Sequence, residues 1–596
     1  MIGRWCDGRN SFGRHRAIRS NPLPLLLGLK PLIVITGFKH CIKLPVNVVW
    51  HASRKLNVRD TAMNDPRQFD LRSLLRYLLI ITIALRLFSF QAVGETASDQ
   101  LWQLCRDKAP VHRFSTLFTA QNVRDNLATE EGRQAAMEWC RKTGVTRVFI
   151  ETFRDGYLAP RELLTQARDE FRSAGFEVSG CVTTTRVGKA STGWNIIACY
   201  TDRATQDKLA EVFRYTASLF DEIMIDDFLF TDCACPDCDA ARKNRRVIVG
   251  DQTFPVAGDT WADYRCELMV QLSRIMILQA ARKVNPNVRI IIKYPQWYDG
   301  FHERGYDVLR QTADFDLIWV GTETRDYDNP RWGRKVQYEA YFIMRWLGGI
   351  GGDKCGGGWF DPFGTTEKTY LEQARQTVLA GARESMLFCY GALQRDTGPR
   401  NIEVFRENIQ DLLRTAEHVR SRSVIGIAAY KPPHSPPGNE PYVFDFVGML
   451  GLPLVPCHEF PTEAKAAFFS SHALTDPDFE TKLAGLVERE VPVLLTDGLA
   501  KRLKNQELLK SSCVHVLPVQ GDPHRLLKLS EEELNTLRQA MLRPWSMTIR
   551  GPNKLGVYVF ADGSYVLENF NDEPVRVDFN GVSHNISARD WVQVWK

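Results

Sequence analysis

The sequence predicts an α/β fold: a closed (β/α)8 barrel of parallel strands, then a small open α/β domain and a C-terminal antiparallel β-domain. Two observations predict the barrel. From His112 to about Arg420, eight short apolar runs alternate with amphipathic helical segments, the pattern of a parallel sheet. In almost every run the charged and aromatic residues follow the apolar ones, and barrel active sites lie at the C-terminal ends of the strands.

The eight predicted strands begin at residues 112, 145, 176, 222, 288, 315, 351 and 384. The seventh run, GGDKCGGGWFDPF, is rich in glycine. Amphipathic segments between the runs predict helices, among them 161–172, 206–220, 264–284 and 366–382. Eight strand–helix units in this length fit one closed barrel, which we assign to residues 95–420.

The pattern changes after residue 420. SVIGIAAY, VFDFVGMLGLPLVPC and VPVLLTDG predict strands or strand–helix junctions, separated by helices such as 478–489. They indicate a small open α/β domain, flavodoxin-like, over residues 421–540. From about Trp545, polar and apolar residues alternate between the turn sequences ADGS, NDEP and FNG. This alternation predicts the antiparallel β-domain, residues 541–596.

The beginning of the chain predicts a targeting signal. Starting at Met63, the sequence has basic residues, an apolar run over 77–90 and small residues up to Gly94. These are the three parts of a secretory signal, so we expect translation to start at Met63, residues 63–94 to be a signal peptide and residues 1–62 to be an upstream extension that is not part of the translated protein. The run is short for a membrane span and an arginine interrupts it, so we expect no stable span, with a membrane anchor as the alternative. The predicted location is periplasmic or secreted.

The composition is that of a globular protein, with 44% hydrophobic and 25% charged residues. The net charge of +5 is small and dispersed, which excludes nucleic acid as an expected partner. Fourteen cysteines are few for a disulfide scaffold of 596 residues, and most stand singly in apolar segments. We expect those to be buried free thiols.

Three cysteines stand out, because Cys233, Cys235 and Cys238 form a CxCxxC cluster after the fourth predicted strand. Thiolates at this spacing can bind one tetrahedral zinc ion. The candidates for the fourth ligand are Cys199, which we favour, Cys266 and Asp232. A disulfide with one cysteine left over is the alternative in an oxidising compartment. We expect a structural zinc at most, and no cofactor for catalysis, because thiolates make the metal a weak Lewis acid and no histidine motif accompanies them.

Carboxylates at the strand ends are the candidate catalytic groups: Asp226 and Asp227 end strand four, and Glu323 ends strand six. Hydrolysis of a glycosidic bond commonly uses two carboxyl groups, one as acid and one as nucleophile or base. Adjacent residues of a strand point to opposite faces, so Asp226 and Asp227 should not flank one bond together. We expect one of them, with Asp226 favoured as nucleophile, to act with Glu323. A salt bridge from Asp227 to Arg186 or Lys293 is the structural alternative.

Charged and aromatic residues at the other strand ends are candidates for sugar binding. Aromatic faces pack on the C–H groups of sugar rings, and charged groups bind the hydroxyls. The candidate substrate-binding residues are Glu151, Arg154, Arg186, Lys293, Trp297, Arg325, Trp359 and Asp361. Core packing is the alternative for any single aromatic residue, so the prediction of a carbohydrate substrate depends on their clustering.

The order of barrel, α/β domain and small β-domain resembles the family-42 β-galactosidases, which also carry a zinc-binding CxCxxC cluster. The resemblance covers most of the chain from His112 onward. That family has Asn-Glu at the end of strand four and a glutamate nucleophile on strand seven, whereas this chain has IDDF and, on strand seven, Asp353 and Asp361. The strand-four aspartate is more similar to α-retaining barrel hydrolases, including the α-amylase and α-galactosidase groups. That resemblance implies a nucleophile at Asp226 and an acid at Glu323.

Together these features predict a secreted or periplasmic glycoside hydrolase that cleaves an oligo- or polysaccharide at the barrel mouth. The alternative is a non-catalytic polysaccharide-binding protein on a barrel scaffold. A hydrolase that uses metal at the cysteine site is a third hypothesis. The architecture also implies that the α/β domain makes homo-oligomer contacts or covers the barrel mouth.

Overall fold

The computed structural model describes residues 96–325 and 336–596. The predicted signal peptide and the segment before it lie outside these residues. Glu95–Lys596 form one compact unit. Within the described ranges, no helix is both long enough and apolar enough to span a membrane.

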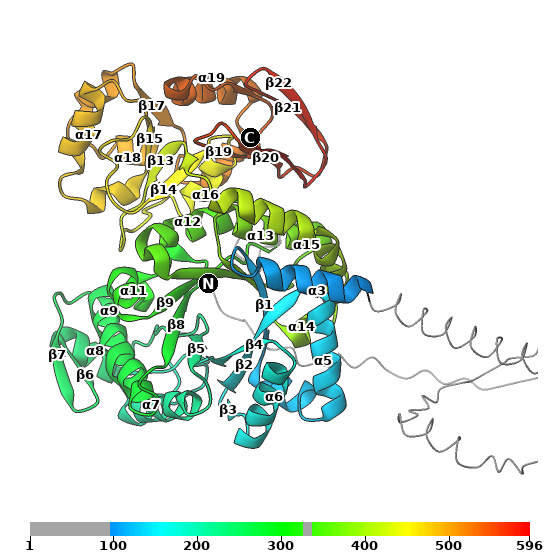
Figure 1. The fold of residues 1–596 in the computed structure, drawn as a ribbon. Helices are drawn as coiled ribbons and strands as arrows, with labels where there is room; N and C mark the ends of the chain where they lie inside the picture. The colour runs from blue at the N-terminus through cyan, green and yellow to red at the C-terminus, as the bar shows by residue number, and fades with distance from the viewer. Residues whose placement is uncertain (1–95, 326–335) are drawn as a thin grey trace, which may run out of the picture. The chain divides into compact units, whose positions relative to one another are not determined.

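Eight parallel strands close into a barrel, as predicted (Figure 1). Their order is β1-β11-β10-β9-β8-β5-β4-β2, and the pairing of β1 with β2 closes the sheet. A two-residue strand, β3 (Tyr157–Leu158), forms a hairpin with β2. The barrel strands are β1 (Arg113–Phe118), β2 (Val145–Arg154), β4 (Glu177–Val182), β5 (Glu222–Ile225), β8 (Arg289–Tyr294), β9 (Leu317–Gly321), β10 (Cys355–Phe360) and β11 (Glu384–Leu387).

Helices cover the outside of the barrel between the strands (Figure 1). The predicted helices are all present, although the segment predicted as 264–284 runs from α9 (Trp261–Leu272) through a π-helical turn (Ser273–Gln279) to α10 (Ala280–Arg282). An insertion between β5 and β8 adds α8 (Pro236–Lys243) and a hairpin of β6 (Arg246–Val249) and β7 (Gln252–Pro255). The other helices of this region are α3 (Thr96–Lys108), α4 (Ala120–Asn126), α5 (Glu130–Lys142), α6 (Arg161–Ser173), α7 (Arg203–Ala217), α11 (Val308–Asp314), α12 (Glu339–Gly351), α13 (Glu367–Leu379), α14 (Tyr390–Leu393) and α15 (Gly398–Arg420).

Side chains fill the interior of the barrel, which is a packed core and not a pore. Each strand contributes one residue to a central cluster: Leu117, Phe149, Cys181, Met224, Ile291, Trp319, Trp359 and Met386. Trp319 explains the glycine-rich strand. A Cβ atom on Gly356 would lie 2.6 Å from Trp319 Nε1, and one on Gly357 would lie 3.0 Å from the same ring. Strand β10 therefore has glycine where the neighbouring indole leaves no room for a side chain.

The second domain is the predicted open α/β domain. Its five parallel strands have the order β14-β13-β15-β16-β17, which is the flavodoxin-like order. The strands are β13 (Ile427–Tyr430), β14 (Leu454–Cys457), β15 (Ala467–Phe469), β16 (Val493–Thr496) and β17 (Val514–Leu517). The helices are α16 (Val443–Gly448), α17 (Phe479–Glu488), α18 (Asp497–Ala500) and α19 (Glu531–Leu542).

The C-terminal domain is antiparallel, as its alternating sequence predicts. One sheet has the order β12-β19-β20-β23 and the other β18-β21-β22. Strand β12 comes from the start of the segment assigned to the α/β domain, so that segment also completes a C-terminal sheet. The strands are β12 (Val424–Ile425), β18 (Ile549–Arg550), β19 (Leu555–Phe560), β20 (Tyr565–Asn569), β21 (Val575–Phe579), β22 (Val582–Ile586) and β23 (Trp591–Val594).

Candidate active site

One lysine lies within 4 Å of three carboxylates at the C-terminal ends of neighbouring barrel strands. Lys293 lies in β8, between β5 and β9 in the sheet. Its Nζ atom lies 2.7 Å from Glu323 Oε1, 3.0 Å from Asp227 Oδ2 and 3.8 Å from Asp226 Oδ1. Burial disfavours the charged amine, but the three carboxylates outweigh burial and raise the pKa of Lys293. The lysine is therefore a fixed positive charge at the barrel mouth.

Asp226 and Asp227 do not lie on opposite faces of a strand, so the argument that separated them does not apply, and the statement that they do not flank one bond together stays a prediction. Strand β5 ends at Ile225, and both aspartates lie in the loop that follows. The backbone N–H of Asp227 donates to Asp226 Oδ1 at 2.8 Å, and both carboxylates reach Lys293. The alternation of a strand no longer applies once the strand has ended.

Asp226 is enclosed and fully engaged. Its Oδ2 atom accepts hydrogen bonds from Arg154 Nη2 at 2.6 Å and from the Thr183 hydroxyl at 3.1 Å. The residue is 2% exposed. Burial disfavours ionisation, but the charges of Arg154 and Lys293 outweigh it and hold the pKa of Asp226 below its usual value. Asp226 is an ionised group without a free oxygen to offer a ligand.

Asp227 is the more accessible carboxylate of the two, with a side chain that is 17% exposed. Burial raises the pKa of Asp227 to about 7, because the attraction of Lys293 only partly offsets burial and the negative charges of Asp226 and Glu323. The hydroxyl of Tyr306 donates to the backbone oxygen of Asp227 at 2.9 Å and fixes the loop. Asp227 can thus change its protonation state near neutral pH.

Glu323 has one oxygen to which no described residue donates a hydrogen bond. Its Oε1 atom binds Lys293, while Oε2 is buried and has no hydrogen-bond partner among the described residues. The space for Oε2 depends on Gly321, where a Cβ atom would lie 2.5 Å from that oxygen. A buried carboxyl oxygen without a donor is costly unless a ligand or a proton occupies it.

Arg154, which pairs with Asp226, also pairs with a second buried carboxylate, Glu151. Glu151 Oε2 accepts from the Ala120 backbone N–H and from Arg154 Nε, each at 2.8 Å. The Thr183 hydroxyl lies against both Glu151 and Asp226. Burial raises the pKa of Glu151, although Arg154 partly offsets this. Arg154 therefore acts between two carboxylates and is held firmly by both.

An aromatic wall borders the lysine on the side of β10. Lys293 Nζ lies 4.1 Å from the centre of the Trp359 ring, in the range of a cation–π contact. Phe388 stacks on Trp359, with ring centres 4.9 Å apart, and Phe363 follows at 6.1 Å from Phe388. Trp359 is 2% exposed and belongs to the barrel core, so Phe363, which is 39% exposed, is the ring of this wall most open to a sugar.

The remaining predicted residues lie at different distances from this centre. Arg325 binds both oxygens of Asp361 beside the aromatic wall. Trp297 packs in an aromatic cluster with Phe230 and Tyr306, and the described contacts do not link it to the carboxylates. Arg186 is exposed, and none of the ion pairs in the described residues joins it to Asp227.

Sequence reasoning missed three residues: Thr183, Tyr306 and Phe388. Thr183 and Phe388 each follow directly after a barrel strand, β4 and β11, so their position was a usable signal. Tyr306 lies in the long loop after β8, where no local pattern distinguishes it from a core aromatic residue.

The four predicted cysteine ligands lie together. The Sγ atoms of Cys199, Cys233, Cys235 and Cys238 all lie within 4.8 Å of one another, and all four residues are buried. Distances between Cys199, Cys235 and Cys238 are 3.6 to 3.8 Å. Tetrahedral zinc with Zn–S bonds of about 2.3 Å requires sulfurs about 3.8 Å apart, whereas a disulfide requires about 2.05 Å. The four thiols are free, and their spacing suits a metal.

The alternative fourth ligands have other contacts. Cys266 Sγ lies 3.4 Å from the His302 backbone oxygen, and Asp232 accepts from Ser191 and from the Trp194 backbone N–H. The geometry therefore favours Cys199.

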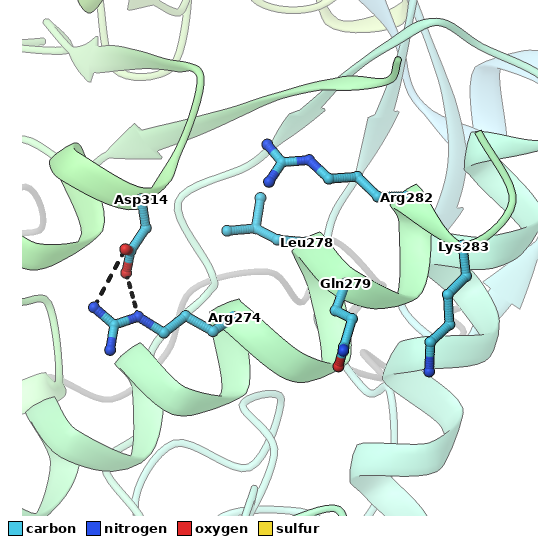
Figure 2. A pocket seen from close by; sticks show the side chains of 6 residues that line it. All are labelled: Arg274, Leu278, Gln279, Arg282, Lys283 and Asp314. Carbon is cyan, nitrogen blue, oxygen red and sulfur yellow. Dashed lines mark hydrogen bonds and ion pairs between the residues drawn. The ribbon is translucent and has the colours of Figure 1, made fainter. Parts of the chain in front are cut away.

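Figure 2 shows a surface hollow of about 560 Å³ whose lining includes none of the candidate catalytic residues. It is lined by Arg274, Leu278, Gln279, Arg282, Lys283 and Asp314. Arg274 pairs with Asp314 at 2.7 Å, and Arg282 pairs with Asp316, which precedes β9. The hollow is therefore at the N-terminal ends of the strands, where barrel residues serve stability. We do not assign it to the active site.

Comparison with known proteins decides the family. Residues 99–417 match the family model described as "Probable glycosyl hydrolase, catalytic domain". The chain belongs to this glycosyl hydrolase family. The predicted barrel glycoside hydrolase is thereby confirmed, whereas the likeness to family 42 stays a prediction.

The second domain of this glycosyl hydrolase has a relative of its own: residues 424–524 match the model "Uncharacterized protein SSO3021, second domain". The chain is 27% identical over 433 residues to the uncharacterized protein SSO3021 of Saccharolobus solfataricus, which covers 68% of this chain and 69% of that protein. Among solved structures, α-L-fucosidase isoenzyme 2 from Paenibacillus thiaminolyticus has a TM-score of 0.53 at 10% identity, covering 81% of this chain and 98% of that one. This likeness shows the fold.

Proposed function

We propose that this chain hydrolyses a glycosidic bond of an oligo- or polysaccharide, with Asp227 as nucleophile and Glu323 as acid. The observation that carries the proposal is the bridge through Lys293. Asp227 and Glu323 come from strand ends on either side of β8, and each gives one oxygen to Lys293 Nζ, at 3.0 and 2.7 Å. Glu323 keeps its second oxygen unpaired within the described structure, and Asp227 is partly exposed.

The bridge also limits the distance between the two carboxylates. Because one nitrogen contacts both, the bridging oxygens lie no more than about 6 Å apart, which supports the retaining spacing of about 5 Å over the inverting range of about 6.5–9.5 Å. In a retaining reaction, Asp227 attacks the anomeric carbon while Glu323 protonates the departing oxygen. Glu323 then removes a proton from water, whose oxygen displaces Asp227 and releases the sugar.

The proposal moves the nucleophile from Asp226, the residue that the sequence favoured, to Asp227. Both oxygens of Asp226 already accept hydrogen bonds, and its carboxylate is held by Arg154 and Thr183. A nucleophile must approach the anomeric carbon, and Asp227 is the exposed member of the pair. We assign Asp226 a positioning role, as a fixed negative charge that holds Arg154 and lies beside Lys293.

The test is turnover of a panel of aryl α- and β-glycosides and polysaccharides by the chain begun at Glu95. The panel includes an aryl α-L-fucoside because of the structural likeness above. We expect Asp227→Asn and Glu323→Gln each to lose about 10²- to 10⁴-fold in kcat. The loss in Glu323→Gln should be smallest for substrates with an acidic leaving group, which needs less protonation. Asp226→Asn, the matched control, should lose less than Asp227→Asn.

Two outcomes would contradict the proposal. Full activity in Asp227→Asn with loss in Asp226→Asn would restore the assignment made from the sequence. Binding of a polysaccharide without turnover on any substrate would support the non-catalytic alternative.

Secretion and homo-oligomer contacts through the α/β domain also remain predictions, and export directed by residues 63–94 can be measured separately.

We also propose a structural zinc ion held by Cys199, Cys233, Cys235 and Cys238. The buried, mutually close thiols support it. Three of them lie in the loop that leaves β5 and leads to α8, the same loop that begins with the two aspartates. A metal there would brace the candidate catalytic loop, and no step of the reaction uses it.

A further inference from the structure

The loop after β8, residues 295–307, connects the candidate active site to the α/β domain. It follows Lys293 and ends near Tyr306, whose hydroxyl donates to the backbone oxygen of Asp227 at 2.9 Å. Between these points the loop carries Tyr298 and Asp299, and both contact the second domain. One short segment thus touches the reacting groups on one side and another domain on the other.

Asp299 is anchored entirely by the α/β domain. Its Oδ1 atom lies 2.8 Å from His472 Nε2, and its Oδ2 atom accepts from the Tyr442 backbone N–H at 2.7 Å. Lys431 Nζ lies 3.7 Å from Oδ1. Asp299 is 6% exposed, so these contacts replace water almost completely. Tyr298 adds a second link, because its hydroxyl donates to Asp445 Oδ1 at 2.9 Å.

His472 is fixed in one orientation. It is fully buried, and burial lowers the pKa of His472, which favours the neutral ring. The Ser470 hydroxyl lies 2.8 Å from Nδ1, so Nδ1 accepts from Ser470 while Nε2 donates to Asp299. The order Ser–His–Asp is also that of a hydrolase triad. Ser470 and His472 have no exposed surface, however, so a positioning role suits them better.

The residues that hold Asp299 and His472 lie at the usual ligand-binding position of an open α/β sheet. Lys431 follows β13, and Ser470 and His472 follow β15, so all three lie at the carboxyl ends of the two strands between which the strand order reverses. Open α/β sheets bind their ligands at this switch point. In this chain a carboxylate of the barrel loop takes that position.

We propose that His472 and Asp299 are positioning residues, through which the α/β domain holds the loop 295–307 so that Tyr306 keeps Asp227 in place. The predicted effect on kcat rests on the proposed function, whereas the link between the α/β domain and the loop 295–307 rests on the buried contacts alone. Displacement of a reacting group by about 1 Å can reduce turnover roughly 10²-fold. The α/β domain is then part of the catalytic apparatus without touching the substrate.

The test compares His472→Leu with His472→Gln in the full chain. We expect His472→Leu to lower kcat about 10- to 100-fold and to raise hydrogen exchange in 295–307. His472→Gln should restore most of both, because its amide can donate to Asp299. In a double-mutant cycle, His472→Leu and Tyr306→Phe should be less than multiplicative, since both release the same loop. If His472→Leu does not fold, Asp299→Asn tests the same contact.

Arg538 supplies the control for a merely structural effect. It is buried and donates to the backbone oxygens of Leu450, Gly551 and Pro552, far along the chain from the loop. Arg538→Lys should lower Tm without changing kcat or exchange in 295–307. Unchanged exchange in His472→Leu, or an equal kcat loss in Arg538→Lys at equal Tm, would overturn the inference. An inactive wild-type protein would overturn the proposed function instead, because the exchange measurement needs no turnover.

Discussion

Lys293 Nζ lies 3.0 Å from Asp227 Oδ2, yet the pKa of Asp227 is raised to about 7. Burial and the charges of Asp226 and Glu323 outweigh the attraction of the amine. The proposed nucleophile is active only when ionised, so kcat/KM should rise with pH, about tenfold per unit, and level off above roughly pH 7. The measurement is the pH profile of kcat/KM on an aryl glycoside.

Asp226→Asn provides the internal comparison for this profile. The substitution removes a negative charge next to Asp227, which lowers the pKa of Asp227 and should shift the acid limb to lower pH. If kcat/KM of the wild type instead decreased as pH rose through 7, Asp227 would be the proton donor and Glu323 the nucleophile.

Gly321 gives a test of Glu323 that leaves the candidate catalytic side chains chemically unchanged. A Cβ atom at position 321 would lie 2.5 Å from Glu323 Oε2, so Gly321→Ala should displace the carboxyl group. We expect a loss in kcat of about 10- to 100-fold, and a lower Tm as well, because the Cβ atom would also lie 3.0 Å from the Gln296 backbone nitrogen. Gly348→Ala is the matched control, because a Cβ atom there meets nothing within 4 Å. Equal activity in the two variants would show that Glu323 does not need its present position.

The four thiols predict a metal content of one zinc ion per chain. Removal of the metal with a chelator, or the substitution Cys199→Ser, should lower Tm, because structural zinc contributes directly to folding. Cys513→Ser is the comparison, since Cys513 is also buried but belongs to the α/β domain. Below the lowered Tm, turnover should remain well above that of Asp227→Asn. A protein without metal, or with a disulfide detected by mass, would refute the zinc site.

The fold could be predicted from the sequence because the signals for it are local. The apolar runs that begin at Val145 and Glu222 each read as a strand without knowledge of their neighbours, and even the glycines of β10 have a nearby cause in Trp319. The types of residue at the strand ends were also predictable, because the order of apolar and charged residues shows where each strand meets the barrel mouth.

The arrangement within the site was not predictable in the same way. The orientation of Asp226 depends on β5 ending at Ile225, because a strand longer by one residue would include Asp226 and set the direction of its side chain. The contact of Asp299 with His472 joins residues 173 positions apart in different domains. Such contacts depend on how the domains pack, and no local pattern encodes them.

A pair of buried carboxyl groups lies outside the active site and makes a separate prediction about stability. Glu372 lies in α13 of the barrel and Glu568 in β20 of the C-terminal domain, and each is 1% exposed. The Tyr558 hydroxyl donates to Glu568 Oε2 at 3.1 Å, and Glu568 Oε1 has no hydrogen-bond partner among the described residues. Burial raises the pKa of Glu372 to about 7 and, together with the charge of Glu372, that of Glu568 to about 8.

These shifts predict that the wild-type protein loses stability as pH rises. In the unfolded chain the pKa of a glutamate is about 4.3, so between roughly pH 5 and 8 the folded state holds protons that the unfolded state has released. The free energy of unfolding should therefore fall by up to about 1.4 kcal/mol per pH unit for each such proton.

Glu568→Gln removes one titrating group and should give a flatter dependence of Tm on pH, with its largest gain in Tm over the wild type above pH 8. The exposed Glu573→Gln, four residues after β20 ends at Asn569, is the control for loss of a charge in the same region and should leave the slope unchanged. The measurement is calorimetric Tm from pH 5 to 9, and equal slopes in the wild type and Glu568→Gln would mean that Glu568 is ionised in the folded protein throughout this range.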